Sequence, residues 1–134
     1  MKLMNLTKQL KCSKLNLDDP NLSKNVCAVG DEGGNFALVD FETESIVLKS
    51  SHPHYSTLSD VCFSSAENHW TLATIATDCQ AVISHFGITE DGNLKILDTM
   101  SFNTNVGDPI AIIPIENSSN YLFVGQGIDI VKLV

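Results

Sequence analysis

The feature that most constrains the fold is a strand-and-turn unit that recurs three times at nearly constant spacing. Each unit is a run of apolar, β-branched and small residues that ends at a polar or glycine-containing turn, and the runs begin at Val26, Leu72 and Tyr121. The starts are 46 residues apart (26 to 72) and then 49 residues apart (72 to 121). Repeats with a period in the forties and four strands each are typical of β-propeller blades.

Strand-like runs and turn clusters also alternate along the rest of the chain. Runs rich in β-branched and aromatic residues are separated by clusters of Gly, Asn, Asp and Ser, for example at 31–35, 89–93 and 125–127. Such alternation predicts antiparallel hairpins. Residues 1–17 fit either a short helix or a first strand, and a strand at 14–17 is favoured. Because no later stretch keeps a helical period, the chain is predicted to be all-β.

The middle unit resembles a blade of the WD-repeat family. The family pattern starts with a His, continues with two apolar residues and a Phe-Ser pair, and reaches an Asp after the following strand. The matching residues are His54, Leu58, Val61, Phe63, Ser64 and Asp78.

In that family the His and the Asp join a hydrogen-bonded network with a Ser or Thr and with the Trp of a Trp-Asp pair. The resemblance therefore implies a structural network of His54, Asp78 and Ser64. Ser84 and His85 stand where the Trp-Asp pair would be, so the network is expected to be partial.

Two further segments, 34–40 and 91–98, resemble the turn-and-strand signature of the family. The resemblance spans about 14–134 and implies a partial WD-repeat propeller of about three four-stranded antiparallel blades. The turn in the second segment leaves two registers open. Either 82–88 and 94–98 form one hairpin, or 94–100 opens the next blade, and the second is favoured because it keeps the period even. The domain boundaries expected are a basic lead at 1–13 and blades at about 14–45, 46–88 and 89–134.

The distribution of charge restricts the partners of the chain. Residues 1–24 carry five Lys and two Asp, a net charge of +3, whereas residues 25–134 carry three Lys and fourteen acids, a net charge of −11. The chain contains no Arg. An acidic body repels the phosphate backbone, and Arg is the side chain best suited to bidentate recognition of phosphate and guanine. The sequence therefore predicts protein or peptide partners and no nucleic acid.

The sequence also predicts an intracellular protein of the cytoplasm or nucleus. Its uninterrupted apolar runs are a few residues long, too short to span a membrane, and the first ten residues lack the pattern of a signal peptide. The four Cys, at positions 12, 27, 62 and 79, lack the spacing of a zinc site or a redox pair. They are expected to be free and mostly buried thiols, as in a reducing compartment.

Candidate chemistry in the chain is sparse. No Ser lies in the glycine-flanked turn of a nucleophile elbow, and the sequence predicts no catalytic residue, no cofactor and no metal site. The alternative is a small ligand- or metal-binding hydrolytic β-domain that uses His52, His54 and Asp60. A metal site of this kind needs a third ligand in a known position, and the spacing does not supply one.

The function implied by the resemblance is a non-catalytic scaffold for protein–protein interaction. Trp70, His69 and Tyr55 are candidates for the binding face, although Trp70 could equally cap a hairpin. A closed propeller needs at least four blades, so about three blades need further blades or a partner to close the ring. Open blade faces are also expected to allow self-association.

Overall fold

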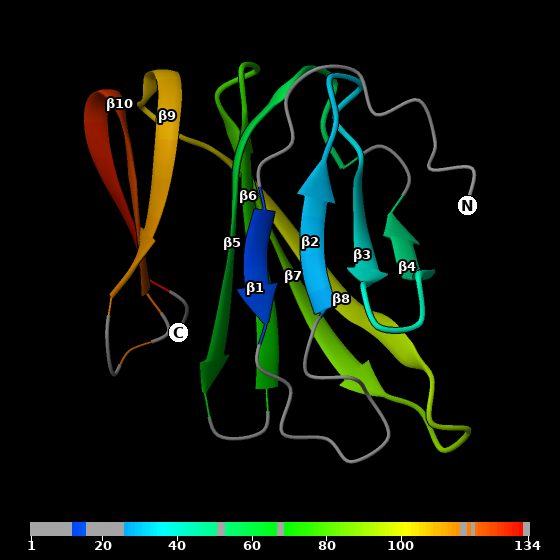
Figure 1. Cartoon of the computed structure of the whole chain (residues 1–134). Coiled ribbons are helices and arrows are strands. Elements are labelled where there is room, and N and C mark those ends of the chain that lie inside the picture. The colour runs from blue at the N-terminus through cyan, green and yellow to red at the C-terminus, as the bar shows by residue number, and fades with distance from the viewer. Residues whose placement is uncertain are drawn as a thin grey trace.

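A computed structural model of the chain describes residues 12–15, 26–50, 53–66, 69–115, 118 and 120–132. Within these ranges the structure consists of strands and turns, and none of the described residues is helical (Figure 1). A helix long and apolar enough to cross a membrane is accordingly absent from this part of the chain. The prediction of an all-β fold is confirmed.

The strands form three antiparallel sheets, in each of which neighbours in sequence are neighbours in space. The first sheet contains β1 (Cys12–Leu15), β2 (Val26–Gly30), β3 (Phe36–Asp40) and β4 (Ser45–Ser50). The second sheet contains β5 (Leu58–Ala66), β6 (His69–Ala76), β7 (Gln80–Ile88) and β8 (Leu94–Asn103). The third is the hairpin of β9 (Gly107–Pro114) and β10 (Asn120–Lys132).

The second sheet lies between the other two and buries apolar side chains on both of its faces (Figure 1). Alternate side chains of a strand point to opposite faces, so Leu72 of β6 packs toward the first sheet while Ala73 packs toward the hairpin. An edge-to-face ring pair lies at each interface. Phe36 and Phe86 join the first and second sheets, with ring centroids 6.4 Å apart, and Phe102 and Phe123 join the second sheet to the hairpin, at 6.1 Å.

The far face of the first sheet is apolar as well. Val26 and Ala28 of β2 point toward the second sheet, and the intervening side chains point away from it. Those on the far face that form a buried cluster of their own are Val29, Ala37 and Val39.

A hydrogen bond of the same kind recurs at both junctions between sheets. At the first junction, the Asp31 carbonyl in the β2–β3 turn accepts a hydrogen bond from the Leu58 amide, where the chain enters the second sheet, at 3.2 Å. At the second junction, the Cys79 carbonyl in the β6–β7 turn accepts hydrogen bonds from the amide and the hydroxyl of Thr104, where the chain enters the hairpin, each at 2.9 Å. Each sheet thus holds the beginning of the next one.

The structure corrects the register favoured at the turn around residue 91. β8 pairs with β7 from Ile88↔Leu94 to Gln80↔Asn103, so it closes the second sheet and does not open a new one. The physical reason is a tight turn in which the Gly92 amide donates to the Thr89 carbonyl at 2.8 Å, while Gly92 itself has a φ of +77°. Glycine reaches this left-handed region without steric cost.

The sheet boundaries differ from the expected blades in consequence. The described strands of the first and second sheets span 12–50 and 58–103, where the even period predicts 14–45 and 46–88. β1 starts within the predicted basic lead 1–13, of which residues 1–11 lie outside the described part. The third sheet consists of two strands in place of four. Its second strand, β10, has a register shift after Val124 and a φ of +118° at Gly127, and Figure 1 shows its end bending back.

Gly34 offers a test of the first junction. Its φ is +80°, and a Cβ atom at this position would lie 2.5 Å from the carbonyl oxygen of His54. We expect Gly34→Ala to lower the free energy of unfolding by about 2–4 kcal/mol, because left-handed strain is joined by a backbone clash. Gly92→Ala is the matched control, since its φ is +77° and nothing lies within 4 Å of the added Cβ. It should cost about 1–2 kcal/mol. Equal losses in urea unfolding of the two variants would contradict a tight junction.

Candidate functional site

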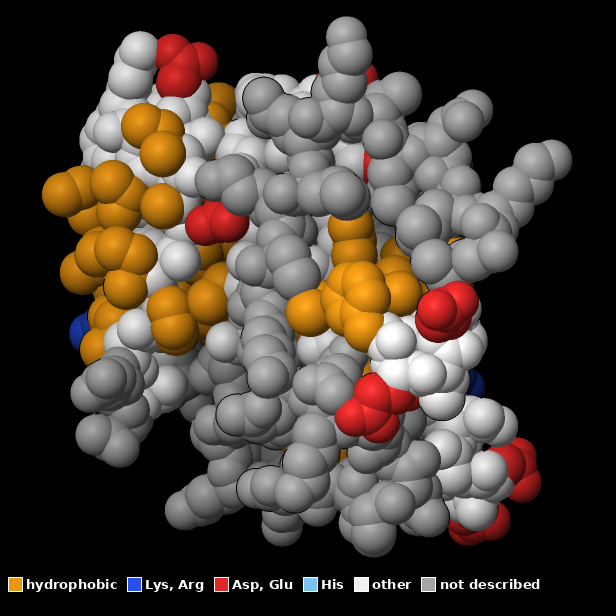
Figure 2. All heavy atoms as spheres, viewed as in Figure 1, with side chains coloured by type: hydrophobic (Ala, Val, Ile, Leu, Met, Phe, Trp, Pro, Cys, Tyr) orange, Lys and Arg blue, Asp and Glu red, His pale blue; other side chains and the backbone are white. Residues whose placement is uncertain are grey.

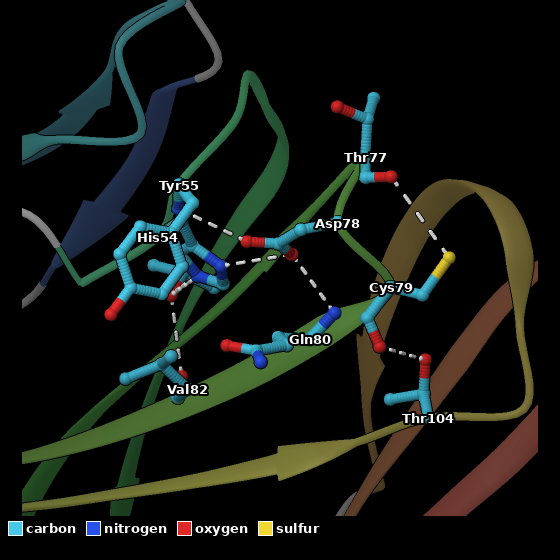
Figure 3. A network of polar contacts seen from close by, with 9 residues as sticks. His54, Tyr55, Thr77, Asp78, Cys79, Gln80, Val82 and Thr104 are labelled. Atoms are coloured by element: carbon cyan, nitrogen blue, oxygen red, sulfur yellow. Dashed lines mark hydrogen bonds and ion pairs between the residues drawn. The ribbon is translucent and has the colours of Figure 1, made fainter.

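A cluster of polar side chains lies at one end of the second sheet (Figure 3). His54 comes from the segment before β5, Thr74 from β6 and Asp78 from the β6–β7 turn. The Nε2 atom of His54 is 2.8 Å from the Thr74 hydroxyl, and its Nδ1 atom is 3.4 Å from Oδ1 of Asp78. One imidazole therefore joins the entry segment, a central strand and a turn.

Burial determines the protonation of this cluster. His54 is 1 % exposed. Burial lowers its pKa from 6.5, since a charged imidazolium loses its hydration there, and the nearby carboxylate of Asp78 opposes this effect only in part. His54 is consequently neutral at pH 7. In the neutral form that suits both neighbours, Nδ1–H donates to Asp78 and Nε2 accepts from Thr74.

Asp78 also organises the backbone on either side of it. Its Oδ1 atom accepts from the Gln80 amide at 2.9 Å, and its Oδ2 atom accepts from the Tyr55 amide at 3.1 Å (Figure 3). Cys79, which lies between Asp78 and Gln80 in the turn, has a φ of +61°. A short carboxylate that bonds to nearby amides is a typical way of stabilising such a turn. The Asp78 side chain thus fixes both the β6–β7 turn and the segment that enters β5.

The structure brings together two of the three residues expected in the network. His54 and Asp78 are in contact. Thr74 occupies the third place, which the sequence analysis assigned to Ser64. Ser64 pairs with Thr71 on β6, three residues before Thr74. The side chain of Ser64 lies outside the described part, so its assignment to this network stays a prediction.

Thr74 was not singled out in the sequence. It lies on β6, four residues before Asp78 of the following turn. Strand alternation puts Thr74 on the same face as Leu72 and Ala76, which point toward the first sheet. Its hydroxyl also lies 3.3 Å from the Val82 carbonyl on the neighbouring strand.

The residues of the hydrolytic alternative are not brought together in the described structure. His54 is engaged by Thr74 and Asp78. Asp60 on β5 accepts a 2.8 Å hydrogen bond from the Ile112 amide on β9, which links the second sheet to the hairpin. His52 lies outside the described residues, and the described part of the chain contains no group of three side chains suited to hold a metal ion.

The candidates for a binding face fall into different environments. Tyr55 is 89 % exposed, on the segment that enters β5. Trp70 is partly buried and packs against the apolar cluster between the first and second sheets, so its observed contacts are those of a packing residue. Of His69 only the backbone is described, as the first residue of β6.

The cysteines that the structure describes are free thiols. Cys27 and Cys62 are buried and Cys79 is half-buried, as expected, while the side chain of Cys12 lies outside the described part. Burial, with a smaller contribution from the charge of Asp60, raises the pKa of Cys62 to about 11. The thiolate is the nucleophilic form of cysteine, so Cys62 is unreactive at neutral pH.

The lowered pKa of His54 predicts how stability depends on pH. The unfolded chain binds a proton near pH 6.5 while folded His54 stays neutral, so the free energy of unfolding should fall as the pH drops below 6.5, by up to about 1.4 kcal/mol per pH unit. Above this pH the contribution is complete. We expect His54→Gln to be less stable at pH 7.5 and the difference to narrow toward pH 5. A difference that widens on acidification would show that the folded protein prefers charged His54.

The hydrogen bond between Asp60 and Ile112 can be tested in the same way. Asp60→Ala leaves the Ile112 amide without this acceptor and should cost about 1–3 kcal/mol in urea unfolding. Asp60→Asn keeps an acceptor oxygen and should cost less. The control is Asp98→Ala on β8, whose exposed carboxylate bonds to the amide of the next residue. It should stay within about 0.5 kcal/mol of wild type, and an equal loss there would contradict a specific role for Asp60.

Comparison with known proteins assigns no family. No family model matches the sequence, and no curated protein matches it either. The resemblance to WD-repeat blades rests on the residues of this chain and stays a prediction.

Proposed function

We propose that the chain is part of a WD-repeat β-propeller and acts as a non-catalytic scaffold for protein or peptide partners. The single observation that carries the proposal is the contact of His54 with Thr74 and Asp78. The family resemblance places a His, a Ser or Thr and an Asp in one network, and here they meet between the entry to a four-stranded sheet and the turn after its second strand.

The arrangement of the sheets supports the same proposal. Two four-stranded antiparallel meanders are packed face to face, and a third sheet continues the series. In repeat proteins of this kind each unit buries its apolar faces against its neighbours. Further blades, or a partner, would close the ring.

In this proposal the polar groups of the site stabilise the fold. His54, Thr74 and Asp78 bond to one another and to the backbone, which favours a structural role over acid–base chemistry. Function then lies in exposed loops and sheet edges, where a rigid β-scaffold commonly carries its binding residues.

The partner chemistry follows from charge and exposure. Residues 25–134 have a net charge of −11, which disfavours nucleic acid and favours a protein or peptide with basic groups. Tyr55 offers an exposed aromatic ring, a side chain enriched where interfaces have their strongest contacts. The buried thiols fit a protein of the cytoplasm or nucleus.

Tyr55→Ala tests the scaffold. In quantitative affinity purification from cells, followed by mass spectrometry, we expect a defined set of partners to fall at least about fivefold relative to wild type, because truncating a central aromatic residue of an interface costs more than about 1 kcal/mol. Leu97→Ala is the matched control, since Leu97 is also an exposed apolar residue but lies on β8. It should keep these partners.

Two outcomes would contradict the proposal. One is a partner set that both variants retain in full, which removes Tyr55 from any binding face. The other is a purified wild-type chain that holds stoichiometric metal and loses it in His54→Ala, which would favour the ligand-binding or hydrolytic alternative.

A further inference from the structure

The outer strand of the second sheet, β8, has an open edge. β8 is the last strand of this sheet, so β7 pairs with one of its edges and no strand in the described part of the chain pairs with the other. All residues from Leu97 to Ser101 are exposed. The outer edge of β8 therefore presents backbone amides and carbonyls to the surroundings.

Two hydrogen bonds show which backbone groups of β8 point outward. The Thr104 amide, just after the strand, donates to the Cys79 carbonyl just before β7, so it points toward β7. The Thr99 amide donates at 2.8 Å to the carboxylate of the residue before it, so it does not bond to β7. Inward and outward backbone groups alternate along a strand that is paired on one side. The amides and carbonyls of Thr99, Ser101 and Asn103 therefore point outward.

The two halves of this edge differ in protection. Edge strands commonly avoid unwanted pairing through Lys, Pro or a β-bulge. The first half of β8 has two of these devices, Lys95 and a bulge at Leu97, whereas 99–103 keeps a regular register and contains neither Lys nor Pro. β4, the outer strand of the first sheet, is six residues long and has both a bulge and Lys49. The second half of β8 is thus an edge without the usual protection.

This edge is open for a reason that does not depend on further sheets. The first sheet and the hairpin pack on the two faces of the second sheet, and a strand edge lies between the faces. Further blades would cover faces and leave the outer edge of β8 exposed. Propellers normally keep such edges short and protected, so a strand of ten residues with an unprotected half is a departure that calls for a partner.

We infer that an extended segment of a partner protein binds along 99–103 as a fifth strand of the second sheet. The outward amides and carbonyls of Thr99, Ser101 and Asn103 supply the backbone hydrogen bonds for this strand. Addition of a strand to a sheet edge is a common mode of peptide recognition, in which the backbone provides affinity and alternate side chains provide specificity.

Charge selects a basic segment as the occupant. Asp98 is exposed beside the open half, and residues 25–134 have a net charge of −11. Acidic side chains are more prominent than basic ones on the face drawn in Figure 2. A Lys or Arg of the partner beside Asp98 would draw its carboxylate away from the Thr99 amide, which then pairs with the added strand. A second copy of this chain is disfavoured, because two chains with a net charge of −8 each repel one another.

A short synthetic peptide tests the inference on the full chain. In the labelled probe, valine and threonine alternate between terminal lysines, and in the control probe a proline stands at the centre. We expect fluorescence anisotropy to give a Kd below about 1 mM for the first peptide. Binding of the second should be at least about fivefold weaker, because proline lacks the amide that an outward carbonyl of β8 would accept from.

Ser101 provides a matched pair of variants. Ser101→Pro removes an outward amide from the middle of the open half and spares the pairing with β7, since edge strands tolerate proline where the amide faces away from the sheet. It should weaken binding of the first peptide at least about fivefold. Ser101→Ala keeps the amide and should bind within about twofold of wild type. Circular dichroism checks that both variants fold.

Hydrogen exchange followed by NMR keeps the inference testable if Ser101→Pro fails to fold. In wild type, bound peptide should slow exchange of the Ser101 and Asn103 amides and leave the amides of β4 unchanged. Three results would overturn the inference: no saturable binding of the first peptide up to about 1 mM, equal binding by folded Ser101→Pro and Ser101→Ala, or protection that falls away from β8.

Tyr55→Ala separates this inference from the scaffold proposal. Because Tyr55 lies on the segment before β5 and not on β8, its truncation should leave peptide binding unchanged. Loss of peptide binding in folded Tyr55→Ala would show that the peptide does not use the β8 edge. A peptide that fails to bind wild type, together with cellular partners that depend on Tyr55, would overturn strand addition and leave the scaffold proposal standing.

Discussion

The rest of the structure depends on how the segment 53–57 is held between two turns. On one side Gly34 lies so close to the His54 carbonyl that no side chain fits between them, and the Thr57 hydroxyl bonds to the Glu32 carbonyl. On the other side Asp78 binds His54 and the Tyr55 amide. This double attachment sets the distance between the first and second sheets. The apolar side chains between them can then pack without a gap, and the same attachment is repeated at the hairpin by Thr104 and Cys79.

Burying an imidazole at this junction has an energetic cost that its two hydrogen bonds must offset. A buried polar group without a partner costs about 1–3 kcal/mol, and His54 avoids this cost because each ring nitrogen faces a hydroxyl or a carboxylate. The two hydrogen bonds of His54 stabilise the neutral imidazole, whose charged form burial disfavours. Acid therefore weakens the junction between the sheets, whereas the apolar packing that it aligns does not change with pH. The polar cluster specifies the geometry, and the two apolar interfaces provide most of the stability.

Local patterns predicted the elements of this fold better than their grouping. The all-β class and the recurring strand at Val26 and Leu72 followed from alternation and spacing, whereas the pairing of His54 with Asp78 was what the family resemblance implied. The even period placed β8 in the wrong sheet. The hydrogen bonds of the turn around Gly92 pair β8 with β7, and such bonds cannot be deduced from the spacing of the repeats. Thr74 was missed for a related reason. A strand with several small polar residues does not show which of them faces an imidazole 20 positions away until the register is known.

The position of Tyr55, the residue proposed for the binding face, has a physical basis. Tyr55 lies on the entry segment that both flanking turns hold in place, so an exposed ring there is positioned without ordering a loop on binding, which lowers the entropic cost of association. The β9–β10 hairpin is instead a sheet of two strands, the fewest of the three sheets in the described structure. A two-stranded hairpin is only marginally stable by itself, and its packing on the second sheet covers one side. Covering the other side would stabilise the hairpin further.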